Sequence, residues 1–483
     1  MPIILDCYTD EPAGLGVPPY LGVYPRYIAG RLWLDRENVE YITIDDARLA
    51  LRYGGKRRNG MQTQITTYNL TREPDETMRV LESGDDLIVI CGIQVPGKYL
   101  SALPGTLHEV NGLIAGLDCR KILTGPAATD FGTRLEGGKS AEKADNRQFD
   151  EVIPEYVRGY DEIADCAIMG AKLVDSIPYP VIAELETARG CRRKPGCSFC
   201  TEPLKHRFAF RKIQDINAEA KALRRHGVVD FRLGKQSDLF AWKDTDLNRM
   251  LKGIRGLKVR TLHIDNVDPA NVTSAKVEAV VKYCTPGNVA ALGIESFDRK
   301  VAMDNNLNSL PETSLESIRL INRLGSRRGD NGMPCFLPGI NLLFGLKSET
   351  RSTHKENMRY LKRIYDEGLM VRRINIRQVA AYPGTRLFEE CGDKFIRKNR
   401  RFYWKWRNEI RQMVDNPMLK RLVPEGTVLK GVRMEVHDGN TTFGRQPGTY
   451  PLIVGVKGRL ELGSVCDIKV TGHMLRSVVG EIV

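Results

Sequence analysis

Three cysteines, Cys191, Cys197 and Cys200, lie close together in a region that holds few others. Soft thiolates at this density suit an iron–sulfur cluster or zinc. Three protein ligands would leave one iron of a [4Fe–4S] cluster open to a substrate or cofactor, as an open position marks a catalytic zinc site. The alternative is a zinc knuckle that takes His206 as its fourth ligand. Spacing alone leaves the two interpretations open.

The elements that must position these cysteines begin with a β-branched, strand-like run, Tyr179–Leu185. Over residues 180–395, further strand-like runs alternate with helical patterns, which predicts a full or partial parallel β/α barrel with its chemistry at the C-terminal ends of the strands. Cys191 would lie just beyond the first strand, on that catalytic face. The later runs are Val229–Leu233, Arg260–Ile264, Val289–Ile294, Ile340–Leu343 and Arg373–Val379.

Residues 1–175 also alternate short apolar runs with longer mixed stretches, which indicates βα units and a parallel, Rossmann-like sheet. Ligands of such sheets bind at the carboxyl edge near a switch point, where glycine and proline turns let the backbone approach them. A scaffolding domain with ordinary tight turns is the alternative. The predicted strands are Pro2–Leu5, Val39–Ile44, Leu87–Cys91, Lys121–Thr124 and Cys166–Met169.

The end of the chain has a different character. Lys398–Arg411, within a linker at residues 396–420, alternates basic and aromatic residues. This pattern favours an amphipathic helix that docks Phe402 and Trp406 on the barrel over a surface that stacks on nucleic acid. Residues 421–483 read as short strands with regular turn signals, which predicts a small β-barrel. The predicted fold class is therefore α/β with a small all-β domain at the end.

Composition sets only broad limits. A chain of 483 residues with 42% hydrophobic residues can build about three ordinary domains. No run of about 18 apolar residues and no basic leader are visible, so we expect no membrane span and no signal peptide. Eleven cysteines without a disulfide framework fit a reducing cytoplasm. The net charge of +13 permits a nucleic acid, an acidic protein or a phosphate-bearing ligand and selects none of them.

The central region resembles the radical S-adenosylmethionine (SAM) superfamily, because five further motifs follow the cysteines in that family's order. They are Arg232–Ser237, His263–Pro269, Leu292–Phe297 with its Gly-x-Glu-Ser pattern, Asn341–Thr350 and Tyr382–Thr385. The resemblance implies that Cys191, Cys197 and Cys200 hold a [4Fe–4S] cluster whose fourth iron binds SAM. The residues it implies for SAM binding are Phe199, Gly234, Gln236, Asp265, Glu295 and Ser296.

This sequence departs from the family at the cysteines. The family places three residues between the first two cysteines, and here Arg192–Gly196 makes five. Pro195 and Gly196 allow the longer loop to close on the same cluster, and the extra basic residues alter the mouth of the site. The implied chemistry is reductive cleavage of SAM to methionine and a 5′-deoxyadenosyl radical, in a site that must exclude water.

Two stretches near the N-terminus resemble the cobalamin-binding domains attached to some radical SAM methyltransferases. Gly16–Ala29 is similar to their opening loop and first helix, and Leu123–Thr129 to their fourth strand and glycine turn. The histidine of the Asp-x-His-x-x-Gly signature is absent. The resemblance implies cobalamin as a cofactor and a set of contacts to it: Val17, Pro18, Tyr20, Leu21, Gly92, Gln94, Gly125 and Pro126.

The whole arrangement is most similar to archaeal members of this methyltransferase group that act on a glutamine of methyl-coenzyme M reductase. A peptide segment of that protein is therefore the implied substrate, with a reductant for the cluster as a further partner.

The back half is also similar to tRNA methylthiotransferases. The final segment resembles their TRAM domain, an RNA-binding barrel, so that RNA is the other implied partner. In those enzymes three N-terminal cysteines hold a second cluster. Here the candidates are Cys7, Cys91 and Cys119, of which Cys7 and Cys91 lie in strand-like runs typical of buried thiols. A non-catalytic RNA-binding protein is the third class, and it would require decayed central motifs.

Overall fold

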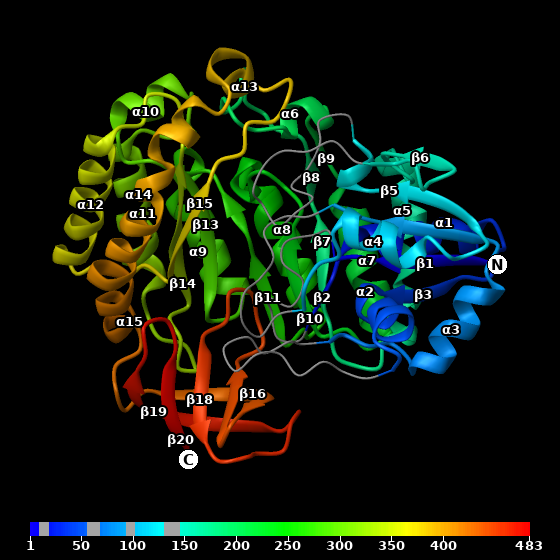
Figure 1. The fold of residues 1–483 in the computed structure, drawn as a ribbon. Coiled ribbons are helices and arrows are strands. Elements are labelled where there is room, and N and C mark those ends of the chain that lie inside the picture. Colours follow the sequence, from blue (N-terminus) through cyan, green and yellow to red (C-terminus); the bar gives the residue numbers. More distant parts are fainter. Residues whose placement is uncertain (9–18, 56–67, 93–101, 130–144) are drawn as a thin grey trace. The chain divides into compact units, whose positions relative to one another are not determined.

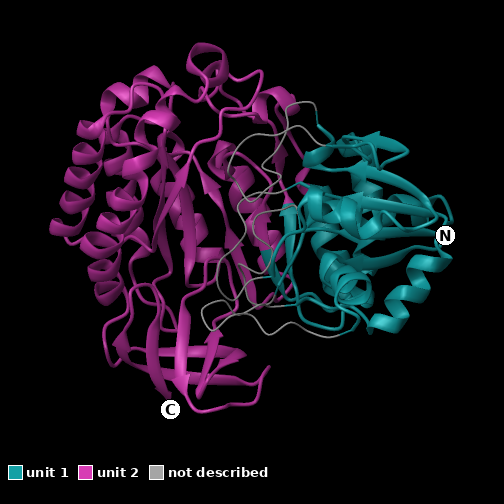
Figure 2. Ribbon diagram, in the orientation of Figure 1, with its two compact units in different colours: residues 1–185, 214–231 teal, residues 186–213, 232–483 magenta. Residues whose placement is uncertain are grey.

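The computed structural model describes residues 1–8, 19–55, 68–92, 102–129 and 145–483. The chain forms two compact units, one of residues 1–185 and 214–231 and the other of residues 186–213 and 232–483 (Figure 2). The division runs through the strands β7 (Ile182–Glu186) and β10 (Asp230–Gly234). Figure 1 shows the elements along the chain.

The first unit is built on a five-stranded sheet with the order β3-β1-β4-β5-β6, in which every neighbouring pair is parallel. The strand order reverses between β1 and β4, which makes that boundary the topological switch point. This confirms the predicted parallel sheet. The strands are β1 (Pro2–Asp6), β3 (Glu40–Thr43), β4 (Asp86–Ile90), β5 (Arg120–Thr124) and β6 (Glu151–Ile153).

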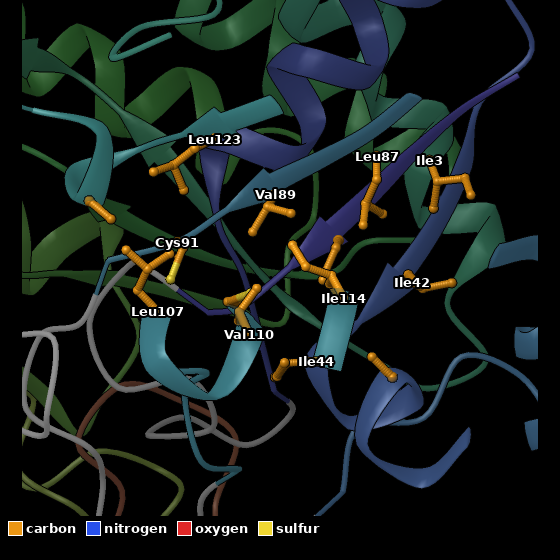
Figure 3. Close-up of a cluster of buried hydrophobic side chains, with 14 of the residues drawn as sticks. Ile3, Ile42, Ile44, Leu87, Val89, Cys91, Leu107, Val110, Ile114 and Leu123 are labelled. Carbon is orange, nitrogen blue, oxygen red and sulfur yellow. The ribbon is translucent and has the colours of Figure 1, made fainter. Parts of the chain in front are cut away.

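The core on one face of this sheet is closed by short helices. Ile3, Val89 and Leu123 from three strands pack with Val110 and Ile114 of a helix (Figure 3). The helices of this unit are α1 (Val23–Leu34), α2 (Ile44–Ala47), α3 (Pro74–Ser83), α4 (Leu107–Ile114), α5 (Tyr160–Met169) and α7 (Ile213–Arg225).

The strand predicted at residues 166–169 is wrong, because these residues end the helix α5. Ile163, Cys166 and Ala167 are its buried positions, a helical spacing that a short apolar run conceals. The helix packs tightly on α1: a Cβ placed on Gly30 would lie 1.9 Å from the carbonyl oxygen of Cys166. Only glycine permits this approach.

The second unit contains a parallel sheet with the order β12-β13-β14-β15. Figure 1 shows α11, α12 and α14 outside these strands. The predicted runs match its strands and those of the adjoining β/α segments. They are β11 (Thr261–Ile264), β12 (Asn266–Val267), β13 (Asn288–Glu295), β14 (Phe336–Phe344) and β15 (Arg373–Gln378). The helices are α6 (Glu202–Lys205), α8 (Asp244–Arg255), α9 (Ser274–Tyr283), α10 (Arg299–Asp304), α11 (Pro311–Gly325), α12 (Arg351–Asp366), α13 (Arg386–Cys391), α14 (Lys394–Ile410) and α15 (Asn416–Leu422).

The basic–aromatic segment forms α14, and the docking interpretation is confirmed for Trp406. Its side chain is buried and stacks on His354, with ring centroids 5.1 Å apart. Phe402 stacks on Trp406 in turn, while Trp404 stays exposed.

The chain ends in a closed five-stranded barrel with the order β16-β17-β18-β20-β19, as predicted. Its core includes Leu337 of β14 and Leu422 of α15. The barrel is therefore packed on its own unit and is not tethered as a separate module. Its strands are β16 (Val428–Asp438), β17 (Thr441–Arg445), β18 (Ile453–Lys457), β19 (Val465–His473) and β20 (Val478–Ile482). Among the described residues, no helix is both long and apolar enough to cross a membrane.

Candidate iron–sulfur and SAM site

The cysteine loop is closed at its base by a two-stranded ladder. β8 (Ala188–Arg189) pairs antiparallel with β9 (Ala209–Phe210), so that the ladder brackets all three cysteines. Gly190 begins the loop with a φ of 72°, and a Cβ there would lie 2.7 Å from the carbonyl oxygen of His206. Its N–H donates to Glu202 at 3.0 Å. Only glycine fits this turn, which sets the direction in which Cys191 leaves the ladder.

The longer spacer between Cys191 and Cys197 is held by the segment that follows α10. The side-chain amide of Asn306 donates to the carbonyl oxygens of Pro195 at 2.6 Å and Gly196 at 3.1 Å. Ser198, which is fully buried, donates through its backbone N–H to the carbonyl oxygen of Asn305 at 2.9 Å. The five-residue spacer thus folds against the chain beyond β13 and leaves the cysteines at the edge where the strands end.

The loop brings together three cysteine sulfurs, the type of ligand that holds an iron–sulfur cluster. Burial raises the pKa of Cys197 to about 12 and that of Cys200 to about 11, and Cys191 lies near enough to both to add to these shifts. No group of three His, Cys, Asp or Glu side chains in the described parts of the chain has the compact arrangement of a single-ion site.

Phe199 lies beside Cys197 in an apolar cluster with Leu310 and Leu343. Both residues are partly buried and pack against this cluster. The cluster contains Val301, Ala302, Leu307, Leu346, Val379 and Leu387 as its fully buried members.

Glu295 lies at the C-terminal end of β13 with a φ of 63°. Burial raises the pKa of its carboxyl to about 8, while the nearby Arg377 guanidinium acts in the opposite direction. A half-buried carboxyl with this pKa is suited to bind the amino group of a ligand, since the ligand's positive charge would favour ionisation.

The other predicted SAM contacts are held mainly by the protein itself. Gln236, which follows Gly234 at the end of β10, accepts from the hydroxyl of Thr187 at 3.3 Å. The hydroxyl of Ser296 accepts from the N–H of Asp298 at 3.1 Å. Gln236 follows the C-terminal end of β10, and Ser296 follows that of β13, directly after Glu295.

Asp265 is bound by two partners, one of them from the small barrel. It forms a buried salt bridge with Arg232, and the Tyr450 hydroxyl donates to it at 2.5 Å. The ring of Tyr450 is covered by the guanidinium of Arg373, 4.3 Å from its centroid. Next to it, the N–H of Thr449 donates to Nδ1 of His263 at 3.0 Å. The segment between β17 and β18 therefore reaches the polar interior of the parallel sheet.

Sequence reasoning missed a row of polar side chains on β14 and β15. Asn341 and Asn375 are register partners, and their side-chain amide groups lie 3.2 Å apart. Arg373, Asn375 and Arg377 alternate with Ile374 and Ile376 along β15. This period of two was the available signal, because a parallel strand covered on both faces is normally apolar throughout.

In the first unit, the turns after β4 and β5 come together at the carboxyl edge. A Cβ on Gly92 would lie 2.6 Å from the Cβ of Pro126, and Gly125 has a φ of 86°. Tyr20 and Leu21 form β2, which pairs with β7 outside the five-stranded sheet. Val17, Pro18 and Gln94 lie outside the described residues.

The three N-terminal cysteines do not share one edge of this sheet. Cys7 and Cys91 follow the C-terminal ends of β1 and β4, are fully buried, and lie close enough to hydrogen-bond. Cys119 instead precedes β5, at the opposite edge. A strand of this length spans about 16 Å, so Cys119 lies too far away to share a cluster with the other two.

Comparison with known proteins gives the class of the central region of the chain. Residues 185–361 match the Radical SAM superfamily. The chain therefore carries a radical SAM domain, whose cofactors are a [4Fe–4S] cluster and SAM.

Two archaeal proteins align along nearly the whole chain. An uncharacterized protein of Methanocaldococcus jannaschii is 41% identical, over 100% of this chain and 93% of its own length. An uncharacterized protein of Archaeoglobus fulgidus is 37% identical, over 98% of this chain and 88% of its own length. The chain belongs to the family that these two proteins represent.

A solved structure extends the likeness beyond the radical SAM domain. The radical SAM methyltransferase TsrM from Kitasatospora setae, with cobalamin and a [4Fe–4S] cluster bound, has a TM-score of 0.50 at 13% identity. The match covers 80% of this chain and 77% of TsrM, which shows a shared fold.

Proposed function

We propose that this protein is a cobalamin-dependent radical SAM C-methyltransferase. The observation that carries the proposal is the pairing of two parts in one chain. One is a radical SAM domain with three closely placed cysteines, and the other is a doubly wound sheet whose Gly92 and Gly125 turns meet at the carboxyl edge. The fold shared with TsrM, which holds both a cluster and cobalamin, supports the same combination here.

In this proposal, Cys191, Cys197 and Cys200 hold the cluster, and Glu295 binds the amino group of SAM. Phe199 and its apolar neighbours exclude water from the cysteine loop. The Gly92 and Gly125 turns would hold cobalamin, with Tyr20, Leu21 and Pro126 as further contacts. The cluster and SAM supply a radical that takes hydrogen from an unactivated carbon, and cobalamin supplies the methyl group.

The substrate that we propose is a peptide segment of methyl-coenzyme M reductase, methylated at a carbon of glutamine. The similarity of the sequence to archaeal members of the methyltransferase group supports this choice, and both aligned relatives are archaeal. A glutamine side chain suits the site, since Asn341 and Asn375 present amide groups on the strands that line it.

The alternative is a tRNA methylthiotransferase with two clusters and an RNA-binding TRAM domain. The closed barrel at the end of the chain is the observation in its favour. Two observations weigh against it: Cys119 lies at the wrong edge of its sheet, and part of the barrel is engaged by His263 and Asp265.

The test is methylation of the glutamine-containing peptide by anaerobically purified protein supplied with cobalamin, SAM and a one-electron reductant. We expect the peptide to gain one methyl group from SAM, and C197A to produce no 5′-deoxyadenosine. The matched control is C335A, a buried cysteine away from the loop, which should keep activity. Iron near eight per chain with no bound corrinoid, against about four for one cluster, would favour the methylthiotransferase.

A further inference from the structure

The guanidinium of Arg193 lies directly on one of the cysteine ligands. Its Nη1 is 3.1 Å from the Sγ of Cys197. Arg193 belongs to the five-residue spacer that sets this loop apart from a three-residue one. The longer spacer therefore brings a positive charge against the sulfur.

Three acceptors fix this guanidinium in place. Nη1 donates to the Oδ1 of Asn308 at 2.8 Å, and Nη2 donates to the carbonyl oxygens of Asn306 at 2.8 Å and Leu307 at 3.0 Å. All three acceptors are neutral, so they orient the group without cancelling its charge. A planar fork held in this way loses little freedom when it donates to a further partner.

Arg193 interacts electrostatically with a carboxyl group and with a cysteine. The carboxyl of Asp268 lies near enough for Arg193 to lower its pKa, although burial has the larger, opposite effect. Glu295, Cys191 and Cys200 all act on Cys197 and favour its neutral form, and Arg193 is the group that favours its thiolate.

The thiol of Cys197 also donates to the Oδ1 of Asn308 at 3.2 Å. A cysteine that binds iron is a thiolate and has no proton to donate. The contact with Asn308 would then be lost, whereas the N–H of Arg193 would face a full negative charge. Arg193 is thus the donor that remains when the site is loaded.

We propose that Arg193 tunes the cluster by donating a charge-assisted N–H···S hydrogen bond to the Cys197 thiolate, which raises the reduction potential. Reduction adds one electron from an external reductant to the oxidised [4Fe–4S]²⁺ cluster and gives [4Fe–4S]⁺. The added negative charge is stabilised by a nearby cation and by hydrogen bonds to the sulfurs. Arg193 is a positioning and tuning residue and does not touch the reacting carbon. This inference rests on the proposed cluster ligands.

The test is a potentiometric titration of the cluster-loaded full chain without SAM, followed by the EPR signal of the reduced cluster. We expect R193Q to reduce the equilibrium constant for reduction about tenfold, which lowers the midpoint potential by about 59 mV for a one-electron couple. The matched control is R192Q, which also removes one positive charge from the spacer. The Arg192 guanidinium donates to the carbonyl oxygen of Ala241 at 3.0 Å. This control should leave the midpoint nearly unchanged.

A second pair of variants, R193K and R192K, tests the inference if R193Q fails to hold a cluster. R193K keeps the charge but not the fork, and we expect its midpoint to lie below that of R192K. Equal midpoints in wild type and R193Q, equal shifts in R192Q and R193Q, or equal midpoints in the two lysine variants would overturn the inference. A wild-type protein that holds no iron–sulfur cluster would instead overturn the proposed function.

Discussion

Each unit contains a carboxyl group at the end of a strand or on the helix that follows it, and the surroundings of the two groups differ. Asp46 in the first unit is buried, and Glu295 in the second unit is half-buried. In the first unit, the Asp46 carboxylate accepts from the N–H and hydroxyl of Thr43, at 2.8 and 2.9 Å. It also accepts hydrogen bonds from the N–H and hydroxyl of Thr71, at 2.8 and 2.7 Å. In the second unit, none of the hydrogen bonds identified among the described residues is donated to the carboxyl group of Glu295, whose pKa is raised to about 8 by its removal from water.

The number of hydrogen bonds made to each carboxyl group suggests the two different roles that we assign: a structural role for Asp46 and a binding role for Glu295. Burying a carboxyl group is costly unless its hydrogen bonds are replaced, and Asp46 has them replaced by the protein. It completes a capping box that fixes the start of α2. Glu295 is instead held ready for a partner from outside, which is the arrangement expected of a ligand-binding carboxylate.

The largest effect that we expect is on folding, from D46A. Loss of four hydrogen bonds to a buried group should lower the free energy of unfolding by about 3 kcal/mol. Chemical denaturation followed by circular dichroism measures this loss. SAM affinity should not change, so a variant that is stable but binds SAM weakly would contradict the assignment of Asp46 to the scaffold. T71A, which removes one of the four donors, should cost about 1 kcal/mol.

E295Q is expected to change SAM affinity. It should weaken SAM binding to cluster-loaded protein by roughly 10- to 100-fold, since a hydrogen bond to a charged group is worth about 1.5–3 kcal/mol. Equilibrium dialysis with labelled SAM measures the change. E312Q, an exposed carboxyl, is the control. Unchanged binding in E295Q would remove Glu295 from the site.

The pH dependence sharpens the same comparison. The pKa of Glu295 is raised to about 8 without ligand. Below about pH 8 the carboxyl group must therefore release its proton before it can bind the amino group of SAM, and this lowers the affinity. SAM affinity should rise with pH and level off above about 8, and E295Q should show no such rise. Without ligand, the raised pKa means that Glu295 destabilises the fold increasingly from its ordinary pKa of 4.5 up to about 8. A pH profile that is the same in both proteins would contradict this role.

The smallest effect concerns the contact from the small barrel. Y450F removes only the hydroxyl that donates to Asp265 at 2.5 Å. We expect a loss of about 1 kcal/mol, or roughly fivefold, in SAM affinity with the fold intact. Y283F is the matched control, since its hydroxyl donates to Asn248 at 3.4 Å on the outer helices. Equal affinities in Y450F and wild type would leave the barrel without a role at the site.

Much of the architecture could be predicted because its signals are local. The runs at residues 229–233 and 289–294 correspond to β10 and β13, since short apolar segments between turns are typical of buried strands. The cysteine loop was equally visible, because its three cysteines lie within ten residues of one another. The strand prediction for residues 166–169 was wrong because four apolar residues are compatible with both a strand and the end of a helix.

The contacts that shape the site could not be predicted. Arg193 and Asn308 are 115 residues apart, and Tyr450 and Asp265 are 185 apart. No periodicity links such positions, and only the folded chain brings them together. The polar row of β15 was present as a pattern, but its meaning depends on Asn341 of the neighbouring strand.

The central claim is that three cysteines hold a cluster with one iron open to SAM. The most direct measurement is EPR spectroscopy of the reduced protein, isolated without oxygen, before and after SAM is added, with iron and zinc determined on the same sample. We predict about four irons per chain and a signal that changes when SAM binds. Zinc in place of iron, or an iron–sulfur signal that SAM leaves unchanged, would contradict the account.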